Sequence, residues 1–419
     1  MLQKELEELL VNNKWDEAIL HIETIDRRLN DEELSTLAWC YSRSGKYDKA
    51  IELYDEMISR EPQKAKWYYA KGYQFYMQQI WQTAIDNFTL ALSIYENYFI
   101  VKYRIAYAYI QMSGNVLQWS KDSFWKAIRH LEDCHKIFSS YTPEEQENAA
   151  STYADICALH GKTIMTSERY LDKSIDLLKK ALELKADDDF KYQLAKAYYA
   201  KKQYSEALDA LPISNKPYYV AELRGQILSD SGEYERSNSI LLALIKFRKK
   251  DYLFRRISDN FLKMCNIDKA EEFANKAIQF KRRNYKNHYA LGVVLKEKMM
   301  YRSAISSLEN ARKYKQDEYS MDCIEAIQLI DEINALSNNN PIDIVAAHES
   351  KASDISVGKI IKYNANKGYG FILDFSTTQN LFFHISSFSS GEVKIGQKVS
   401  YEIIKTEKGE QAINVSYIR

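Results

Sequence analysis

The feature that most constrains the fold of this chain is a repeated pairing of an aromatic residue with an alanine three positions later. The pairing occurs in KWDEA, KYDKA, IWQTA, QYSEA and MYRSA, and its alanines are Ala18, Ala50, Ala84, Ala207 and Ala304. Near copies end at Ser237 and Ala270. Apart from a longer interval between Ala84 and Ala207, successive anchors lie 30 to 34 residues apart. A period of this length indicates an array of small structural repeats.

A second small residue stands twelve positions before most of these anchors, at Ala38, Gly72, Ala195, Gly225, Ser258 and Gly292. Small residues on either side of a turn allow two antiparallel helices to approach closely. Gly45 and Gly232 fall at that turn, where a helix end favours a residue that tolerates positive φ. In period and pattern the chain resembles the tetratricopeptide repeat, although the family's terminal proline is present once, as Pro62, and is mostly absent elsewhere.

On this resemblance we expect nine helix pairs between about residue 1 and residue 316. The following segment places Ile324, Ile327, Ile330 and Ile333 on one predicted stripe, as a capping helix requires. A polar, aperiodic stretch comes next. The sequence therefore predicts an all-α solenoid over residues 1–336 and a linker over residues 337–355.

The resemblance implies a concave groove lined by the first helix of each pair, and such grooves usually hold a peptide or a protein segment. The register of the small positions places a row of rings in this groove: Trp39, Tyr69, Tyr73, Tyr103 and Tyr107. These rings suit an extended peptide or unstacked bases, but tyrosines at this spacing also pack neighbouring helices together. The Lys and Asn set with which some family members hold a terminal carboxylate is not matched, which argues against a chaperone-tail receptor.

Basic residues recur one repeat apart near the ends of two second helices. The clusters are KFRKK, with Lys246, Arg248 and Lys249, and KRR, with Lys281, Arg282 and Arg283. Cations at helix C-termini are common partners of the helix dipole, whereas stacked clusters would form a phosphate-binding edge of the solenoid. The 58 basic and 58 acidic residues of the chain cancel, so any affinity for nucleic acid is local.

No pattern in the chain predicts a metal, a cofactor or a catalytic centre. His130 and Cys134 lie four apart on one predicted helix, and Cys157 and His160 lie three apart on the next, which would be a plausible zinc donor set. Structural zinc sites usually have tighter CxxC spacing, and Cys157 falls at a core position of the repeat. The chain also lacks a P-loop, a nucleophile elbow and an HExxH motif. We therefore expect no enzymatic activity.

Three features predict a cytoplasmic protein without a membrane association. The five cysteines are scattered without a CxxC pair. The amino terminus is charged and amphipathic, unlike a signal peptide. No apolar run approaches the ~20 residues that a membrane-spanning helix needs.

From Val357 onward the helical period gives way to alternation. Five short runs separated by turn-forming residues predict five strands, which favours a small closed barrel over residues 356–419. Alternation directs Phe383 and the aliphatic residues inward. It leaves outward an exposed patch made of Tyr369, Phe371, Phe382 and His384, flanked by Lys362 and Lys367. Such a patch suits the bases of a single strand, because each stack contributes ~1–3 kcal/mol.

Two motifs within this segment, NKGYGFI and LFFHI, resemble the RNA-binding motifs of the cold-shock domain, an OB-type barrel that binds single-stranded RNA and DNA. The resemblance implies stacking and phosphate-contacting roles for Tyr363, Lys367, Tyr369, Phe371, Phe382 and His384. Lys362 stands where the family usually has tryptophan, and Ile385 replaces a surface phenylalanine. The loop after that strand is also short and lacks a usual aromatic residue. These departures imply a shorter footprint and weaker binding by this domain alone.

The sequence thus predicts a multidomain protein, an all-α solenoid followed by an all-β OB-type barrel. We expect a non-enzymatic adaptor, in which the barrel binds single-stranded RNA or DNA and the groove recruits a protein or peptide. The alternative is a protein-interaction scaffold or peptide-sensing regulator whose barrel has little role with nucleic acid.

Overall fold

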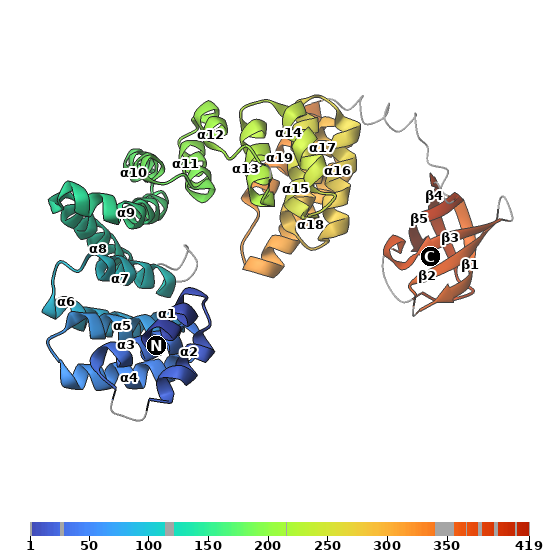
Figure 1. Ribbon diagram of the computed structural model, residues 1–419. Coiled ribbons are helices and arrows are strands. Elements are labelled where there is room, and N and C mark those ends of the chain that lie inside the picture. The colour runs from blue at the N-terminus through green and yellow to red at the C-terminus, as the bar shows by residue number, and fades with distance from the viewer. Residues whose placement is uncertain are drawn as a thin grey trace. The chain divides into compact units, whose positions relative to one another are not determined.

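The structure, a computed structural model, describes residues 2–25, 29–113, 121–214, 216–339, 356–365, 367–375, 379–388, 393–406 and 409–418. Within these residues, nineteen α-helices are followed by five β-strands (Figure 1). The chain divides into two units, Met1–Cys265 and Asn266–Arg419. Most of the linker predicted over 337–355 lies outside the described residues.

The first unit contains helices α1 to α15, and each helix packs against the next one along the chain. Their bounds are α1 Leu2–Val11, α2 Trp15–Glu23, α3 Asp31–Arg43, α4 Tyr47–Arg60, α5 Ala65–Met77, α6 Trp81–Ile94, α7 Phe99–Met112, α8 Lys121–Ser140, α9 Pro143–Ile164, α10 Leu171–Leu184, α11 Asp188–Ala200, α12 Tyr204–Ala210, α13 Tyr218–Asp230, α14 Tyr234–Leu244 and α15 Asp251–Lys263. The second unit begins with α16 Ile267–Phe280, α17 Tyr285–Glu297, α18 Tyr301–Tyr319 and α19 Ile324–Asn339.

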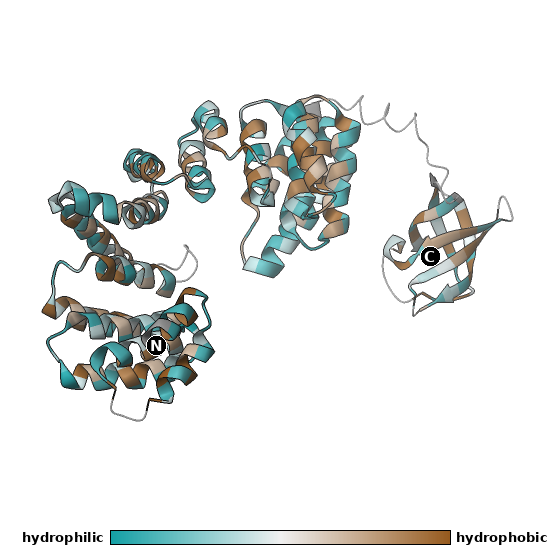
Figure 2. Ribbon diagram, in the orientation of Figure 1, coloured by the Kyte–Doolittle hydropathy of each residue, from teal (hydrophilic) through white to brown (hydrophobic). Residues whose placement is uncertain are grey.

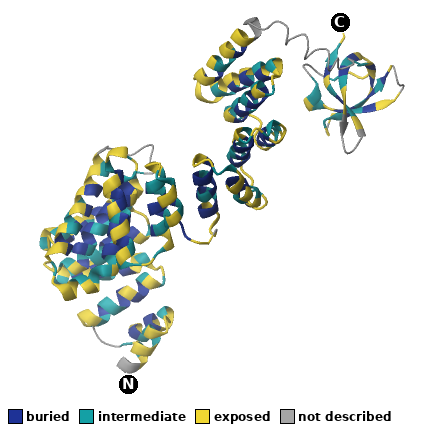
Figure 3. Cartoon of the chain, turned by 90° about the horizontal axis from the view of Figure 1, so that it is seen from above, coloured by how far each residue is buried: buried dark blue, intermediate teal, exposed yellow. Residues whose placement is uncertain are grey.

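The small residues of the repeat lie where paired helices cross, as the sequence predicts. A Cβ added at Gly72 would lie 2.7 Å from the ring of Phe88, and one added at Gly225 would lie 2.6 Å from Leu241. The alanines of the repeated pair are fully buried. Figure 2 shows hydrophobic and hydrophilic residues interspersed along the helices, and Figure 3 shows buried residues gathered on their packed sides. Close approach at these positions therefore builds the core of the array.

The turns before seven of the second helices each hold one residue in the left-handed region. This residue stands two positions before the aromatic residue or Ile267 that begins the helix, at Asn13, Gly45, Gln79, Lys202, Gly232, Cys265 and Met299. In most of these turns the next backbone N–H closes the preceding helix, as Lys46 N does on Tyr41 O at 2.8 Å. Glycine marks only two of the seven turns, so five of them carry the steric cost of a side chain in this conformation.

Helix α19 packs against α18, but its buried stripe differs from the predicted one. Ile333 is fully buried, whereas Ile324 is 55% exposed. The reason is geometric: an α-helix turns about 100° per residue, so a step of three residues drifts by about 60°. After three such steps Ile324 and Ile333 lie on opposite faces. The buried residues at the start of the helix are Cys323 and Ala326 instead.

The five strands close into a barrel in the order β1-β2-β3-β5-β4. Their bounds are β1 Ser356–Asn364, β2 Tyr369–Asp374, β3 Asn380–His384, β4 Lys398–Thr406 and β5 Gly409–Tyr417. The strand pairs are antiparallel except β3 with β5, which is parallel. The barrel core consists of Ile360, Ile372, Leu381, Phe383, Val399, Tyr401, Ala412 and Val415. Among the described residues, every helix is too short or too polar to serve as a membrane span.

Candidate nucleic-acid interface

The outward rings of the barrel lie on the paired strands β2 and β3. In the antiparallel register Tyr369 lies opposite His384, and Phe371 lies opposite Phe382. Burial alternates along β2, so that the residues between these rings point into the core. Because cross-strand neighbours on one face have Cβ atoms about 5 Å apart, the register alone brings the four side chains into one patch.

The rings of this patch support one another at different angles. Tyr369 and Phe382 are stacked, with centroids 5.7 Å apart. Phe371 meets Phe382 edge-on at 5.9 Å and Tyr369 edge-on at 6.3 Å. All three are half-buried, and His384 is exposed. The patch therefore presents ring faces and edges in more than one plane, which suits bases splayed from a single strand better than a flat stacked duplex.

Beneath the patch, the backbones of β1 and β2 approach closely because residue 370 is a glycine. A Cβ at this position would lie 2.5 Å from the carbonyl oxygen of Lys362 and 2.5 Å from the ring of Phe383. The inward ring of Phe383 therefore fills the space that a side chain at Gly370 would need. This contact sets β1, β2 and β3 at the spacing that holds the outer rings together.

Two lysines flank the patch. Lys362 pairs with Phe371 across β1 and β2, and Lys367 lies in the turn between these strands. Both are exposed, and within the described part of the chain neither forms an ion pair with a carboxylate. Their charges are therefore available to phosphate groups.

Contacts with Ser386, just beyond the end of β3, determine which ring nitrogen of neutral His384 carries the proton. The backbone N–H of Ser386 donates to His384 Nδ1 at 3.3 Å, and the Ser386 hydroxyl lies 2.9 Å from the same nitrogen. Because Nδ1 accepts a hydrogen bond, the ring carries its proton on Nε2. His384 therefore offers an N–H donor at the rim of the ring patch.

Tyr363 is not brought to the patch. A register shift between Ile360 and Lys362 interrupts the alternation of β1. Beyond the shift, Tyr363 packs against the core, with its ring stacked 6.2 Å from Phe383. A bulge of this kind has no clear signal in a single sequence.

Two further phenylalanines follow β2 and β3 and have different surroundings. Phe375 is exposed at the end of β2, where the Lys398 ammonium lies 6.0 Å from its ring. Phe388 follows the short 3-10 helix Ile385–Ser387 and meets Tyr417 edge-on at 5.0 Å. Phe388 therefore packs against the core of the barrel, and Phe375 lies beyond the ring patch.

The tyrosines predicted to line the groove are half-buried. Tyr69, Tyr73 and Tyr107 pack with the cluster around Tyr76, whose ring lies 5.8 Å from Tyr73 and 5.6 Å from Tyr107. Tyr103 packs with the neighbouring cluster, and Trp39 meets Trp15 edge-on at 4.8 Å. These ring contacts are the ones expected if the tyrosines pack neighbouring helices together.

Among the residues considered as a zinc set, Cys134 and His160 have hydrogen-bond partners outside it. His160 is fully buried, and its Nδ1 lies 2.9 Å from Nε2 of His135, whose Nδ1 lies 2.9 Å from the hydroxyl of Tyr153. Burial lowers the pKa of His160 to about 3 and that of His130 to about 4. In the described residues no three His, Cys, Asp or Glu side chains converge as metal ligands.

The basic clusters lie in turns. Lys246, Arg248 and Lys249 are exposed between α14 and α15 in the first unit. Lys281, Arg282 and Arg283 are exposed between α16 and α17 in the second unit. Sequence reasoning missed a pocket beside the first cluster, which Arg248 helps to line.

Comparison with known proteins identifies both parts of the chain. The model of the 'Cold-shock' DNA-binding domain matches residues 356–418, and the tetratricopeptide repeat model matches residues 31–64, which contain α3 and α4. Neither family is catalytic. The probable cold shock protein y4cH of Sinorhizobium fredii is 39% identical over 57 residues, which are 13% of this chain and 83% of the relative. The cold shock-like protein CspG of Shewanella violacea is 38% identical over 66 residues, 15% of this chain and 94% of the relative.

Among solved structures, yeast Tom70 aligns with 84% of this chain and 98% of its own, at 12% identity and a TM-score of 0.38. The matched models, the paired helices with small residues at their crossings, and the closed five-stranded barrel agree with one another. The chain therefore belongs to the cold-shock domain family through residues 356–418, which follow an array of tetratricopeptide repeats and so join a nucleic-acid-binding module to a protein-interaction module.

Proposed function

We propose that this protein is a non-enzymatic RNA-binding adaptor, in which the barrel binds single-stranded RNA and the helical array recruits a protein partner. The observation that carries the proposal is the cross-strand set of Tyr369, Phe371, Phe382 and His384. Solvent-facing rings in one patch are unfavourable in water unless a ligand covers them. Bases provide flat apolar faces for the rings and phosphates for the flanking lysines.

The proposed roles follow from position. Tyr369, Phe371 and Phe382 stack on successive bases, and His384 donates from Nε2 to a base edge or a phosphate oxygen. Lys362 and Lys367 contact phosphates, so binding weakens as salt rises. Tyr363 supports the inward Phe383 and contributes through the shape of β1.

The absence of a ring at position 362 explains why an array would be joined to this barrel. With Lys362 where the family usually has tryptophan, the barrel contacts fewer bases. A second contact in the same chain raises the effective concentration of the first and increases overall affinity without new barrel contacts. We propose residues 1–336 as the partner-binding domain, 337–355 as the linker and 356–419 as the RNA-binding domain.

The test is fluorescence anisotropy of a labelled single-stranded RNA with the full-length protein. The Phe371→Ala/Phe382→Ala variant removes two stacking rings, and at ~1–3 kcal/mol each we expect affinity to fall by at least tenfold. The matched control is Phe375→Ala, which removes an exposed ring that directly follows β2 and lies outside the patch. We expect this control to bind like the wild type.

Circular dichroism of each variant excludes unfolding as the cause of a loss. Equal RNA binding by the double variant and the wild type would contradict the role of the patch. Absence of any salt-dependent binding by the wild type would favour the alternative function, a scaffold whose barrel does not bind RNA. A matching measurement with single-stranded DNA of the same sequence tests the preference for RNA.

A further inference from the structure

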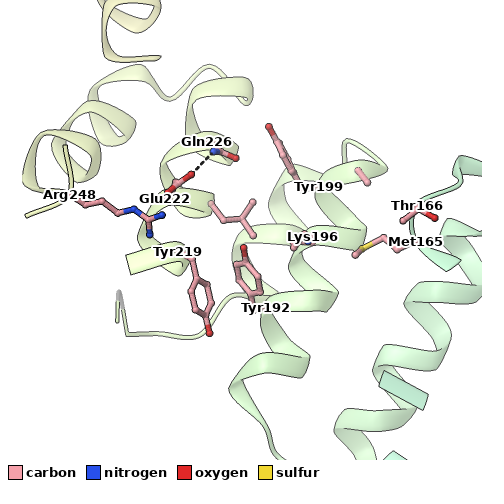
Figure 4. A pocket seen from close by; sticks show the side chains of 11 residues that line it. Met165, Thr166, Tyr192, Lys196, Tyr199, Tyr219, Glu222, Gln226 and Arg248 are labelled. Carbon is pink, nitrogen blue, oxygen red and sulfur yellow. Dashed lines mark hydrogen bonds between the residues drawn. The ribbon is translucent and has the colours of Figure 1, made fainter. Parts of the chain in front are cut away.

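A pocket of about 510 Å³ opens in the first unit between α11, α13 and the residues that follow α9. Its volume lies within the ~300–1,000 Å³ range of ligand sites. In Figure 4, Tyr192 and Tyr219 adjoin each other in the middle of the pocket, Arg248 and Glu222 lie at one side, and Met165 lies at the other. The rings of Tyr192 and Tyr219 meet edge-on with centroids 4.6 Å apart. The pocket thus combines ring surfaces with charged groups.

A second ring pair lies immediately beside this pocket. Phe247 precedes Arg248 and is 74% exposed, and Tyr218 precedes Tyr219 and is 44% exposed. Their rings are stacked, with centroids 6.2 Å apart and an angle of 15° between the planes. An exposed phenylalanine stacked on an exposed tyrosine forms an apolar platform whose outer ring face is open to a ligand.

The cations around the two ring pairs have no carboxylate partner among the described residues, although the Lys196 ammonium lies 5.9 Å from the ring of Tyr192. Within the described residues, none of Lys196, Lys246, Arg248, Lys249 and Lys250 forms an ion pair. The nearby carboxylates of Glu222 and Asp251 interact with other side chains. Glu222 accepts hydrogen bonds from the hydroxyl of Tyr252 at 3.0 Å and from Gln226 Nε2 at 3.4 Å, and Asp251 pairs with Arg255 at 3.1 Å. The positive charge is therefore available to a ligand.

The helix dipole accounts for only part of this cluster. Lys246 and Arg248 follow the end of α14, where cations are favourable. Lys250, however, is the N-cap residue of α15, makes no side-chain cap hydrogen bond and places a cation at the positive end of a helix dipole. Lys196 is half-buried inside the pocket, where burial and the neighbouring Lys162 lower its pKa. A bound anion would stabilise the cations at both positions.

We propose that this pocket and the loop 246–250 form a second binding site for single-stranded RNA, located on the helical array. One base stacks on the platform of Phe247 and Tyr218, and a second enters the pocket against Tyr192 and Tyr219. Phosphates contact Arg248 and the lysines of the loop. The site goes beyond the proposed function, in which the array binds protein only.

The pocket favours a base over an acidic peptide because ring faces line it. A base can stack on Tyr192 and Tyr219, whereas an acidic side chain has no flat apolar face to stack on them. Two ring pairs on adjacent surfaces also match successive bases of one strand. An acidic peptide is therefore the alternative occupant that the experiment must separate.

The test uses the full-length protein and the labelled RNA described above, titrated at several salt concentrations. Phe247→Ala removes an exposed, uncharged ring, and we expect affinity to fall about tenfold with an unchanged salt slope. Lys246→Ala/Arg248→Ala/Lys249→Ala removes three phosphate contacts, and we expect the slope of log K against log salt to fall by about 2. The matched control, Lys281→Ala/Arg282→Ala/Arg283→Ala, removes the same charge from the other unit and should change the slope less.

Combination with Phe371→Ala/Phe382→Ala separates this inference from the proposed function. Residual salt-dependent binding by the barrel variant, lost on adding the loop substitutions, supports the second site. If the loop variants and Phe247→Ala bind RNA like the wild type, the second site is refuted while the barrel proposal stands. If only the loop variants lose binding, the barrel proposal fails and the second site stands.

Two further outcomes would also overturn the second site. An equal effect of the two basic triple variants would show that charge alone is responsible, without the pocket. Wild-type RNA binding by the loop variants, together with loss of binding to a labelled poly-glutamate peptide, would assign the surface to an acidic peptide.

Discussion

Replacement of His160 by glutamine should reduce the acid sensitivity of the helical array. His160 is fully buried in α9, and burial with the neighbouring His135 and Lys173 lowers its pKa to about 3 from an ordinary value of 6.5. Between these values the unfolded chain takes up a proton that the folded chain does not. The free energy of unfolding therefore falls as the pH falls from about 6.5, and His160 contributes its full stability only above that pH.

The size of the effect follows from the width of this window. A group of this kind changes the free energy of unfolding by roughly 1.4 kcal/mol per pH unit once the unfolded state is fully protonated. From about pH 7 to about pH 5 the loss attributable to His160 is roughly 2 kcal/mol. Glutamine keeps a polar group beside His135 but cannot take up the proton, so the His160→Gln variant should lack this part of the pH dependence.

Urea unfolding followed by circular dichroism across this pH range measures the slope directly. The comparison is between slopes, because the substitution also changes the stability at neutral pH. His21→Gln, in α2, is the matched control for the loss of an imidazole outside the buried cluster. A His160→Gln variant with the same pH slope as the wild type would refute the argument that this imidazole is held neutral by burial.

Three further substitutions test the packing of the two domains by thermal or urea unfolding. Gln79→Gly, at a turn with φ of 62°, should stabilise the array by about 0.5–1 kcal/mol, because glycine adopts this conformation without the steric cost; an unchanged midpoint would show that the turn is not strained. Gly292→Ala should destabilise it by about 1–3 kcal/mol, because the new Cβ lies 2.7 Å from the buried Leu308, and a neutral result would mean that Leu308 can move aside. Tyr401→Phe should cost the barrel about 1–3 kcal/mol, because the Tyr401 hydroxyl donates to the buried Asp374; wild-type stability would show that Asp374 does not need this donor.

The array could be predicted from the sequence wherever a position requires one kind of side chain. The crossing points admit only small residues, so Gly72 and its equivalents mark them. The turns were harder, because the left-handed conformation is favoured by glycine but not restricted to it. At Gln79 the closure of the preceding helix outweighs the local cost, and the sequence carries no sign of it.

The ring patch could also be predicted from the sequence, because strict alternation on β2 and β3 determines which face each side chain takes. The placement of Tyr363 was not, since a single irregularity in β1 reverses the faces beyond it. The pocket on the array depends on segments about thirty residues apart that converge only in the folded chain. Tyr192 and Arg248 share no motif, so their proximity could not be read from spacing.

The barrel closes between β3 and β5 through the register pair of Phe382 with Gln411, and a further parallel bridge joins Phe388, beyond β3, to Val415 of β5. Phe382 thus contributes its ring to the proposed RNA surface and its backbone to the pairing of β3 with β5. A strand of RNA bound across Phe382 would stabilise the pairing of β3 with β5. Occupancy should then slow the opening of β3 from β5, and the lifetime of the closed barrel would report whether RNA is bound.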